Sequence, residues 1–335
     1  MSPSAAVTGT FPRSAPARVG AVILNYRSTD DTLAALASLL AGDCLDLSVI
    51  VADNTSAEQA DPELAGRLPG RVRYLPTGRN LGYAAGNNLA IAEHLDAGVE
   101  YILLLNPDAR VQQDTLGRLL TTARQNPQAG FVGPRLLDGD RPGRIVQSDG
   151  GRIDWERGAA PVHLHVHKPA DTLGSEVAEV DYVTGSCVLI SRRVLEDVGL
   201  LPEDYFLYFE ETDFSVRARR RGWLSLVDRA ALARHHRRST GEVPSLPYLY
   251  YLTRNRGIFA TRHLGDPAAL DRAYADLDRR FLGPWRKRVA AAAPELVADF
   301  DNVVAMAKND ASQGRTGECA ELRRFQRQGV PGWSD

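Results

Sequence analysis

The stretch Tyr101-Ile-Leu-Leu-Leu-Asn-Pro-Asp108 decides the fold. Its apolar run ends abruptly in a polar turn that closes on a carboxylate. Such a run, bounded by turn residues, is typical of a strand buried on both faces of a parallel sheet. Ligands of open α/β sheets bind at the carboxyl ends of these strands, and a carboxylate there can hold a divalent cation. An ordinary turn uses the same residue types, so the stretch needs support from other segments.

Two other segments place acids where apolar residues end. Residues 48–56 form an apolar run that leads into Asp53, and residues 205–213 lead from aromatic side chains into Glu210, Glu211 and Asp213. Clustered acids repel one another, so their cost indicates a metal, a cationic partner or proton transfer. A solvated helix start is the alternative, because acids are favourable at a helix N-terminus.

Apolar periodicity predicts strands that alternate with helices, which implies a parallel, doubly wound α/β sheet. The expected strands are 19–25, 47–52, 72–75, 101–105, 130–133, 180–183, 188–190 and 224–227, and the expected helices are 29–40, one ending near 68, 82–95, 114–126 and 212–221. Residues 138–176 are rich in Gly, Pro, Asp and His, which favours hairpins and a mobile loop. On a strand, His163, His165 and His167 would share one face, and a solvated face is favoured there over a metal cluster.

Three parts are expected along the chain. Residues 1–17 are rich in Ser, Ala and Pro without an apolar core, which predicts a disordered lead and not a secretory signal. Residues 18–264 are expected to form the α/β domain. Residues 265–335 are expected to form a helical extension with breaks at Gly265 and at Gly283-Pro284.

The composition excludes several classes of protein. The 335 residues carry a net charge of −2, so nucleic acid is not an obvious partner. No apolar run approaches the roughly 20 residues that cross a bilayer. The widely spaced Cys44, Cys187 and Cys319 favour a reducing cytoplasm. Any membrane contact would then be peripheral, at the inner membrane face, for which the basic residues 286–288 are candidates, and the oligomeric state stays open.

Several motifs together resemble one enzyme family. The chain resembles inverting glycosyltransferases of family 2, which have the GT-A fold, in their rhamnosyltransferase-like branch. The resemblance covers roughly residues 18–262 and implies a Rossmann-like, mostly parallel central sheet flanked by helices. The matching segments, in the family's order, are Ala21–Tyr26, Val51–Ser56, Arg79–Asn88, Leu104–Asp108, Thr184–Ser186, Phe209–Asp213 and Ala233–His236.

The resemblance implies a donor nucleotide site at the first strands. Asp53 would accept a hydrogen bond from the N3–H of a pyrimidine, and Asn25 and Tyr26 would line the same pocket. Asn80, Gly82 and Gly86 would form the next contact. These glycines permit close backbone approach, and Gly82 precedes a helix N-terminus, which favours phosphate; simple use in turns and packing is the alternative.

A divalent cation, Mg²⁺ or Mn²⁺, is the implied cofactor. Asn106-Pro107-Asp108 replaces the family's commoner Asp-x-Asp, so one charge is lost and Asp108 becomes the principal ligand. Asn106 would contact ribose or a metal-bound water. His235 resembles the second protein ligand and His236 is the alternative; on a strand only one of the two can point inward.

The acids before residue 214 imply the catalytic base. By resemblance Glu211 deprotonates the acceptor hydroxyl opposite the leaving group, which gives inversion. Glu210 and Asp213 would orient the loop or bind acceptor hydroxyls. Arg254 and Asn255 resemble an Arg-Asn element that contacts the diphosphate or supports the loop bearing the base.

The expected function is metal-dependent transfer of a sugar from a nucleotide sugar to a hydroxyl of a glycan, a lipid-linked precursor or a secondary metabolite. A deoxyhexose such as rhamnose from a dTDP-sugar is favoured, and a UDP-sugar is the alternative donor. A catalytically silent GT-A module is a second alternative. A nucleotidyltransferase would need a Gly-rich basic loop after the first strand, where this chain has Asn25-Tyr-Arg-Ser-Thr29.

Overall fold

The structure is a computed structural model that describes residues 18–43, 46–58, 60–236 and 243–326. The expected lead at 1–17 and the final residues 327–335 of the expected extension lie outside the described residues. The strands are β1 (Val19–Asn25), β2 (Leu47–Asp53), β3 (Val72–Pro76), β4 (Tyr101–Leu105), β5 (Ala109–Val111), β6 (Ala129–Asp138), β7 (Val146–Ser148), β8 (Gly151–Asp154), β9 (Ala160–His163), β10 (Val177–Val180), β11 (Cys187–Ser191) and β12 (Leu224–His235). The helices are α1 (Thr29–Leu40), α2 (Leu64–Arg67), α3 (Tyr83–Asp96), α4 (Thr115–Gln125), α5 (Arg192–Val198), α6 (Glu210–Arg219), α7 (Leu246–Leu264), α8 (Ala269–Leu277), α9 (Gly283–Ala292) and α10 (Val297–Ser312), with short helical turns η1 (Ala170–Thr172), η2 (Glu203–Tyr205), η3 (Asp278–Leu282), η4 (Pro294–Leu296) and η5 (Ala320–Phe325).

One large sheet organises the chain, with strand order β10-β12-β6-β11-β4-β1-β2-β3. Strands β3, β2, β1 and β4 are mutually parallel. Strand β11 is antiparallel to both β4 and β6, and β12 is parallel to β6. Strands β6 and β12 therefore run in the direction of β4, and the sheet is mostly parallel as the sequence predicts. The carboxyl ends of β1, β2 and β4 consequently meet at one edge.

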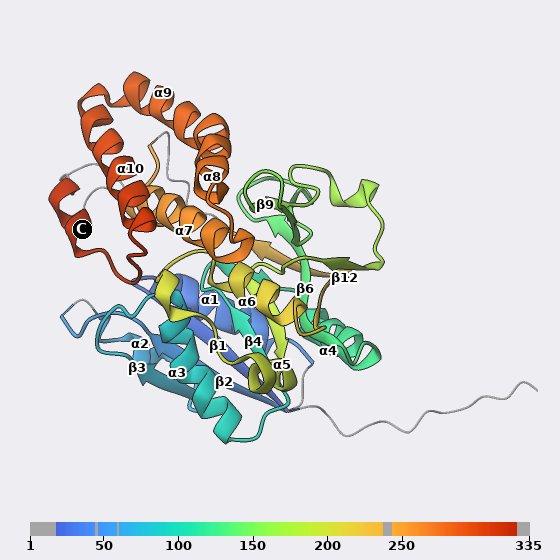
Figure 1. Cartoon of the computed structure of the whole chain (residues 1–335). Coiled ribbons are helices and arrows are strands. Elements are labelled where there is room, and N and C mark those ends of the chain that lie inside the picture. Colours follow the sequence, from blue (N-terminus) through green and yellow to red (C-terminus); the bar gives the residue numbers. More distant parts are fainter. Residues whose placement is uncertain (1–17, 44–45, 59, 237–242, 327–335) are drawn as a thin grey trace, which may run out of the picture.

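Both faces of this sheet are covered, which explains the continuous apolar strands. Ile23 and Leu103 pack with α1 and α4 on one face, whereas Val22 and Leu104 pack with α3, α5 and α6 on the other. Every residue of β1 is buried. Figure 1 shows these helices on either side of the strands. Because parallel strands buried on both faces need apolar residues at every position, the sequence pattern and the layers agree.

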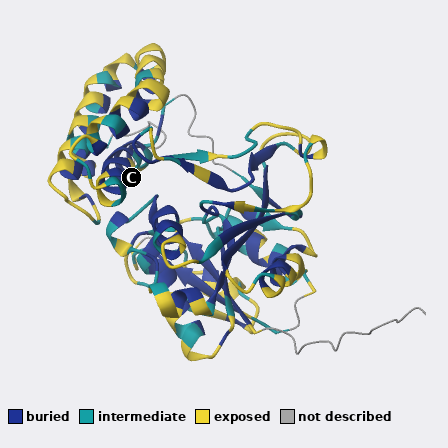
Figure 2. Cartoon of the chain, turned by 45° about the vertical axis from the view of Figure 1, so that its right-hand side comes forward, coloured by how far each residue is buried: buried dark blue, intermediate teal, exposed yellow. Residues whose placement is uncertain are grey.

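The C-terminal helices form a second cluster around α7, which α8 and α10 contact. This cluster also includes Tyr205 and Phe209, which precede α6. In Figures 1 and 2 the C-terminal helices stand beside the sheet layers, with exposed residues along their outer surfaces. The helices beyond Gly265 therefore share a core with the segment that carries the acids.

Several expected elements differ from the structure. Strand β10 ends at Val180, where the expected strand began, and β6 continues to Asp138. The helix expected to end near residue 68 shrinks to the single turn of α2. His165 and His167 have positive φ angles and follow β9, so the three histidines do not share a strand face.

The ends of two further elements also differ. Helix α6 begins at Glu210, two positions before the expected helix at 212. The chain stays helical through Gly283 and Pro284, because the π-helical turn η3 leads directly into α9. The helix ends instead at Ala293, where φ is −150°. The break at Gly265 is present, with the glycine in the left-handed region at φ 66°.

Candidate active site

Asp108 and His235 lie together at the carboxyl edge of the sheet. Asp108 is in the turn after β4, and His235 is the last residue of β12, which pairs with β5. Nε2 of His235 is 3.0 Å from Oδ1 of Asp108. Both atoms are buried and neither makes a hydrogen bond with a described residue. Two facing, unsatisfied metal-ligand atoms fit a shared divalent cation.

His236 faces elsewhere. Its Nδ1 lies 3.4 Å from Asp140, and its side chain is 43% exposed. Adjacent strand residues point to opposite faces, which separates the two histidines. Among the described residues no three His, Cys, Asp or Glu side chains form a metal cluster. The protein thus offers the pair Asp108 and His235, and a bound diphosphate would have to supply the remaining ligands.

A strained loop leads from η2 into α6. Phe206, Tyr208 and Phe209 have φ angles of 67°, 67° and 78°, which bulky side chains rarely adopt. Asn255 Nδ2 donates to the carbonyls of Tyr205, Leu207 and Tyr208 at 3.1, 2.7 and 3.0 Å. Residues 205–209 are hereafter the aromatic loop. Its conformation is held by hydrogen bonds from α7.

Arg254 supports the same loop. It is 1% exposed and donates to the carbonyls of Tyr205 at 2.8 Å and Gly317 at 2.6 Å. Asn255 is fully buried. Of their two expected roles, the placement of Arg254 and Asn255 favours support of the loop over contact with a diphosphate.

The aromatic loop delivers Glu210 and Glu211 to the first turn of α6. Glu210 is 4% exposed, and its Oε2 is buried without a hydrogen-bond partner among described residues. Glu211 is partly exposed. Burial raises the pKa of both carboxyls, and for Glu210 the neighbouring Glu211 charge adds to the effect. Backbone N–H groups, including that of Gly185, oppose the rise in the pKa of Glu211.

Tyr83 and Tyr208 link these acids to Asp108, and sequence reasoning did not single out either. Burial, followed by the charges of Glu210, Glu211 and Asp108, raises the pKa of Tyr83 well above its usual value. The same three carboxylates act on the pKa of Tyr208. The three acids therefore act on one region, the one that holds these two tyrosine hydroxyls. The aromatic run before the acids was the only available signal for Tyr208.

The turn Thr184–Ser186 closes this region. Tyr83 donates to the carbonyl of Gly185 at 2.8 Å, and the N–H of Asn106 donates to the carbonyl of Ser186 at 2.9 Å. A Cβ on Gly185 would lie 2.8 Å from the Tyr83 hydroxyl oxygen. A glycine is therefore needed for the close approach between this turn and α3.

Asp213 differs from its neighbours because it is fully paired. It accepts from Tyr205 at 2.9 Å, from Arg217 at 2.8 Å and from Arg262 at 3.0 Å, and His263 Nε2 lies 2.9 Å away. Its side chain has no exposed surface. This environment favours orientation of α6 over contact with an acceptor.

On the donor side, Asn25 and Asp53 are paired across β1 and β2. Asn25 donates to Asp53 Oδ1 at 3.0 Å, and Tyr74 donates to Oδ2 at 2.8 Å. Asp53 is 1% exposed, whereas Tyr26 is 45% exposed. A nucleobase could reach Asp53 only if the Tyr74 side chain moved aside.

The glycine segment before α3 is built around polar contacts and close packing. Asn80 Oδ1 accepts from the N–H of Gly82 at 2.9 Å and from Asn54 at 3.1 Å. A Cβ on Gly82 would lie 2.4 Å from the carbonyl oxygen of Phe206, and one on Gly86 would lie 2.7 Å from Leu24. Both glycines are used for packing, the alternative that the residues alone left open.

The sheet, its flanking helices and the acids at its carboxyl edge define a glycosyltransferase of the GT-A fold. Residues 16–258 match the family model described as "Glycosyltransferase like family 2", and the chain belongs to this family. A crystal structure of GalNAc-T7 with UDP, GalNAc and Mn²⁺ shares the fold, with a TM-score of 0.52, 13% identity and coverage of 84% of this chain and 58% of that chain.

Two relatives carry rhamnosyltransferase names. "N-acetylglucosaminyl-diphospho-decaprenol L-rhamnosyltransferase" of Mycobacterium tuberculosis (strain ATCC 25618 / H37Rv) is 32% identical over 248 residues, which cover 69% of this chain and 80% of the relative. "dTDP-rhamnosyl transferase RfbF" of Shigella flexneri is 26% identical over 201 residues, which cover 59% of this chain and 62% of the relative. The resemblance to a rhamnosyltransferase-like glycosyltransferase is confirmed. In the part of the chain that the structure describes, no helix has the length and apolar character to cross a membrane.

Proposed function

We propose that this glycosyltransferase moves a deoxyhexose such as rhamnose from a dTDP-sugar to an acceptor hydroxyl, with inversion and with a divalent cation. One observation carries the mechanism: the turn Thr184–Ser186 accepts from the N–H of Asn106 at 2.9 Å, and Gly185 of the same turn hydrogen-bonds Glu211 through its backbone, so the candidate base lies beside the segment that bears the candidate metal ligand. The printed names of the relatives support the choice of sugar. A UDP-sugar remains the alternative donor.

Glu211 is the proposed base. Its carboxylate takes the proton of the acceptor hydroxyl while the hydroxyl oxygen attacks the anomeric carbon. The bond from that carbon to the diphosphate oxygen breaks on the opposite face, so the configuration inverts. Burial raises the pKa of Glu211, and a carboxylate with a raised pKa is a stronger base. Partial exposure leaves Glu211 accessible to an acceptor.

Asp108 and His235 are the proposed metal ligands. A divalent cation bound there would neutralise charge on the leaving diphosphate. Asn106 is proposed to contact ribose or a metal-bound water. The close approach of Asp108 Oδ1 and His235 Nε2, two buried atoms of metal-ligand type, supports this assignment.

The acceptor is proposed to be a glycan or a lipid-linked precursor, reached at the cytoplasmic face of a membrane. The relative in Mycobacterium tuberculosis is named for a diphospho-decaprenol substrate. Within the basic segment, Arg286 is paired with Asp301 at 2.7 Å. Lys287 and Arg288 are exposed, as are Arg280 and Phe281 on the preceding turn. Sedimentation with anionic vesicles, compared with neutral ones, tests this contact.

The proposed function is tested with purified protein and a panel of nucleotide sugars. We expect dTDP-rhamnose to raise the midpoint of thermal unfolding more with Mn²⁺ than with EDTA, because binding to the folded state stabilises it. We expect transfer to an N-acetylglucosaminyl-diphospho-polyprenol acceptor, with a product anomer opposite to that of the donor by NMR.

The outcomes separate the parts of the proposal. Transfer from UDP-sugars alone would replace the donor assignment. Full activity in EDTA, or full activity of Asp108→Ala, would overturn the metal assignment and leave the fold intact. A retained anomeric configuration would overturn the single-displacement mechanism.

A further inference from the structure

Gln147 lies behind the proposed metal ligand His235. It is the central residue of β7 and is 4% exposed. Its Oε1 is 2.7 Å from Nδ1 of His235, and its Nε2 donates to the backbone carbonyl of His235 at 3.3 Å. One side chain therefore contacts both the ring and the backbone of this histidine.

These two contacts fix the orientation of the amide. A backbone carbonyl only accepts hydrogen bonds, so the NH₂ end of Gln147 must face it. The oxygen end must then face Nδ1, which consequently carries a proton. In the neutral ring the other nitrogen, Nε2, then has a lone pair that faces Asp108 Oδ1, 3.0 Å away. Two acceptors at this distance repel each other unless a proton or a metal cation lies between them.

We propose that Gln147 is a positioning residue that holds the His235 ring with its Nε2 lone pair free for a divalent cation shared with Asp108. The proposal rests on the metal assignment made above. A histidine that ligates a metal commonly donates its other N–H to an oxygen acceptor, which fixes the ring orientation. In this chain the oxygen acceptor is the neutral side-chain amide of Gln147.

The strand that carries Gln147 is irregular at this residue. Val146 pairs with Leu137 and Ser148 pairs with Leu136, with a register shift between the two pairs. Gln147 is the residue left between them. A local irregularity of this kind re-aims a side chain, which explains how Gln147 reaches His235 across β6.

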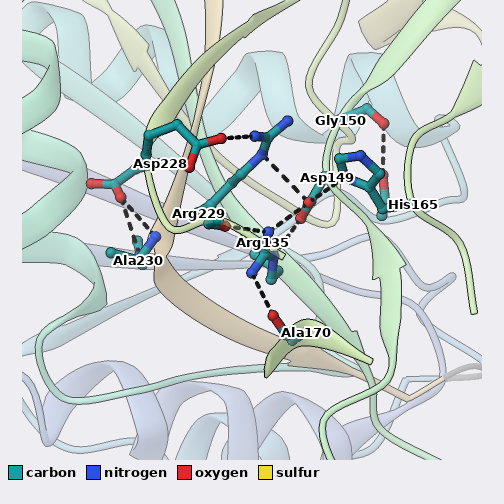
Figure 3. A network of polar contacts seen from close by, with 12 residues as sticks. Arg135, Asp149, Gly150, His165, Ala170, Asp228, Arg229 and Ala230 are labelled. Atoms are coloured by element: carbon teal, nitrogen blue, oxygen red, sulfur yellow. Dashed lines mark hydrogen bonds and ion pairs between the residues drawn. The ribbon is translucent and has the colours of Figure 1, made fainter. Parts of the chain in front are cut away.

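A buried ion network anchors the end of β7 (Figure 3). Asp149 has no exposed surface and accepts from Arg135 at 2.7 and 2.8 Å. His165 Nδ1 lies 2.8 Å from the same carboxylate, and Arg135 also donates to the carbonyl of Ala170 at 3.3 Å. Asp149, two residues after Gln147, is therefore held in place by Arg135 of β6 and by His165 of the loop after β9. These contacts fix the backbone that carries Gln147.

Gln147→Leu tests the inference because leucine fills much of the same space but lacks both the acceptor for Nδ1 and the donor to the His235 carbonyl. With no acceptor at Nδ1, the proton is expected to move to Nε2 and to donate to Asp108, which blocks the cation site. We expect the affinity for Mn²⁺, measured by electron paramagnetic resonance in the presence of dTDP, to fall by roughly 10–100-fold. The ¹⁴N coupling of His235 to bound Mn²⁺ should be lost in pulsed spectra.

Two further variants control the experiment. Gln147→Glu retains an oxygen acceptor for Nδ1, so Mn²⁺ affinity should stay within a few-fold of the parent or tighten. Ser148→Ala alters the next residue of β7, which is 2% exposed and contacts His163 instead of His235, and it should leave both Mn²⁺ affinity and the ¹⁴N coupling unchanged. Circular dichroism verifies folding of each variant.

The outcomes distinguish this inference from the proposed function. If the parent shows no protein-bound Mn²⁺ with dTDP or UDP, the metal assignment itself fails. If the parent binds Mn²⁺ and His235→Ala abolishes the ¹⁴N coupling, but Gln147→Leu matches the parent, only the role of Gln147 is overturned. Equal losses in Gln147→Leu and Ser148→Ala would also overturn it, because they would indicate general disruption of β7.

Discussion

Two carboxylates in the first turn of α6 experience opposite environments. Burial alone would raise the pKa of Asp213, but the hydrogen bond from His263 and the charge of Arg262 lower it to about 2. Glu210 is equally buried, yet its Oε2 has no hydrogen-bond partner among described residues and burial raises its pKa well above the usual value. The pKa values of two acids only three positions apart are therefore shifted in opposite directions.

This difference separates Asp213, whose charge stabilises the fold, from the acids that we propose take part in the reaction. Asp213 ties α6 to α7 and to the aromatic loop, so its charge is fully used inside the protein. Glu210 and Asp108 each have a buried oxygen that makes no hydrogen bond within the described part of the chain, although that of Asp108 lies 3.0 Å from His235 Nε2. Unsatisfied buried polar atoms cost stability, and a site that binds a cation or moves a proton provides a reason for that cost.

The largest expected effect is on Asp213. Asp213→Ala leaves Arg217, Arg262 and His263 without their shared partner, so we expect the free energy of unfolding at pH 7 to fall by about 3–5 kcal/mol. The pKa of Asp213 is lower in the folded state than in the unfolded state. The extra stability of the parent over the variant should therefore be present above pH 3.8 and be lost as the pH falls through about 2. Urea unfolding at several pH values measures both effects.

Asp266→Ala is the matched control. Its carboxylate pairs with Arg272 at the surface, where both side chains are about 40% exposed, and the change should cost less than about 1 kcal/mol. Equal losses of unfolding free energy in the two variants would show that the buried Asp213 cluster stabilises the protein no more than a surface ion pair does. Asp213 would then no longer count as a structural acid.

Asp53 combines features of both kinds of acid. Like Asp213 it accepts hydrogen bonds within the protein, from Asn25 and Tyr74, and it is nevertheless the proposed nucleobase contact. Asp53→Ala should weaken dTDP binding by about 1.5–3 kcal/mol, the worth of a hydrogen bond to a charged group. Calorimetry with the metal-free nucleotide measures this directly. An unchanged affinity would group Asp53 with Asp213 as a structural acid and place the base elsewhere.

The aromatic loop connects the two kinds of acid. Asn255→Ala removes the donor to three loop carbonyls, so the free energy of unfolding should fall by about 1–3 kcal/mol. Amide exchange should accelerate most in residues 205–209, because their strained conformation loses its support. Exchange that increases uniformly over the chain would contradict a local role.

Glu210→Gln should have the smallest effect on stability, and of opposite sign. The folded pKa of Glu210 is raised, so its ionisation opposes folding as the pH rises above the unfolded value of 4.5. We expect a gain below about 1 kcal/mol at pH 8, which vanishes below pH 4.5, where both states carry the proton. A loss of stability at pH 8 would show that the charged Glu210 has a partner.

The sequence predicted the central strands well, because burial on both faces leaves nearly continuous apolar runs in β1, β2 and β4. Strand β12 was predicted only to Val227, since Asp228, Arg229 and Ala230 interrupt the apolar pattern. Asp228 accepts from the N–H of Ala230 at 3.0 Å, which stabilises a register shift there. The strand then continues to His235.

The site was predicted in part, and the limits are physical. Motif resemblance pointed to Asp108, His235 and the α6 acids. The structure places Asp108 beside His235, whereas it pairs Asp213 with side chains of α7. Gln147 carries no local signal, because its partner His235 is 88 positions away. Tyr83 lies in a matching segment, but its contact with Gly185, 102 positions away, could not be predicted from that segment. The positive φ angles of the aromatic loop depend on hydrogen bonds from α7, which no local pattern encodes.

The central claim is that Glu211, and not the more deeply buried Glu210, accepts the acceptor's proton. The direct measurement is turnover and donor affinity of Glu211→Gln and Glu210→Gln at saturating acceptor. Glutamine keeps shape and hydrogen bonding but cannot take the proton, so Glu211→Gln should lower turnover by roughly 10²–10⁴ with donor affinity near the parent's. Glu210→Gln should cost less. A larger loss in Glu210→Gln, or parent-like turnover in both variants, would contradict the account.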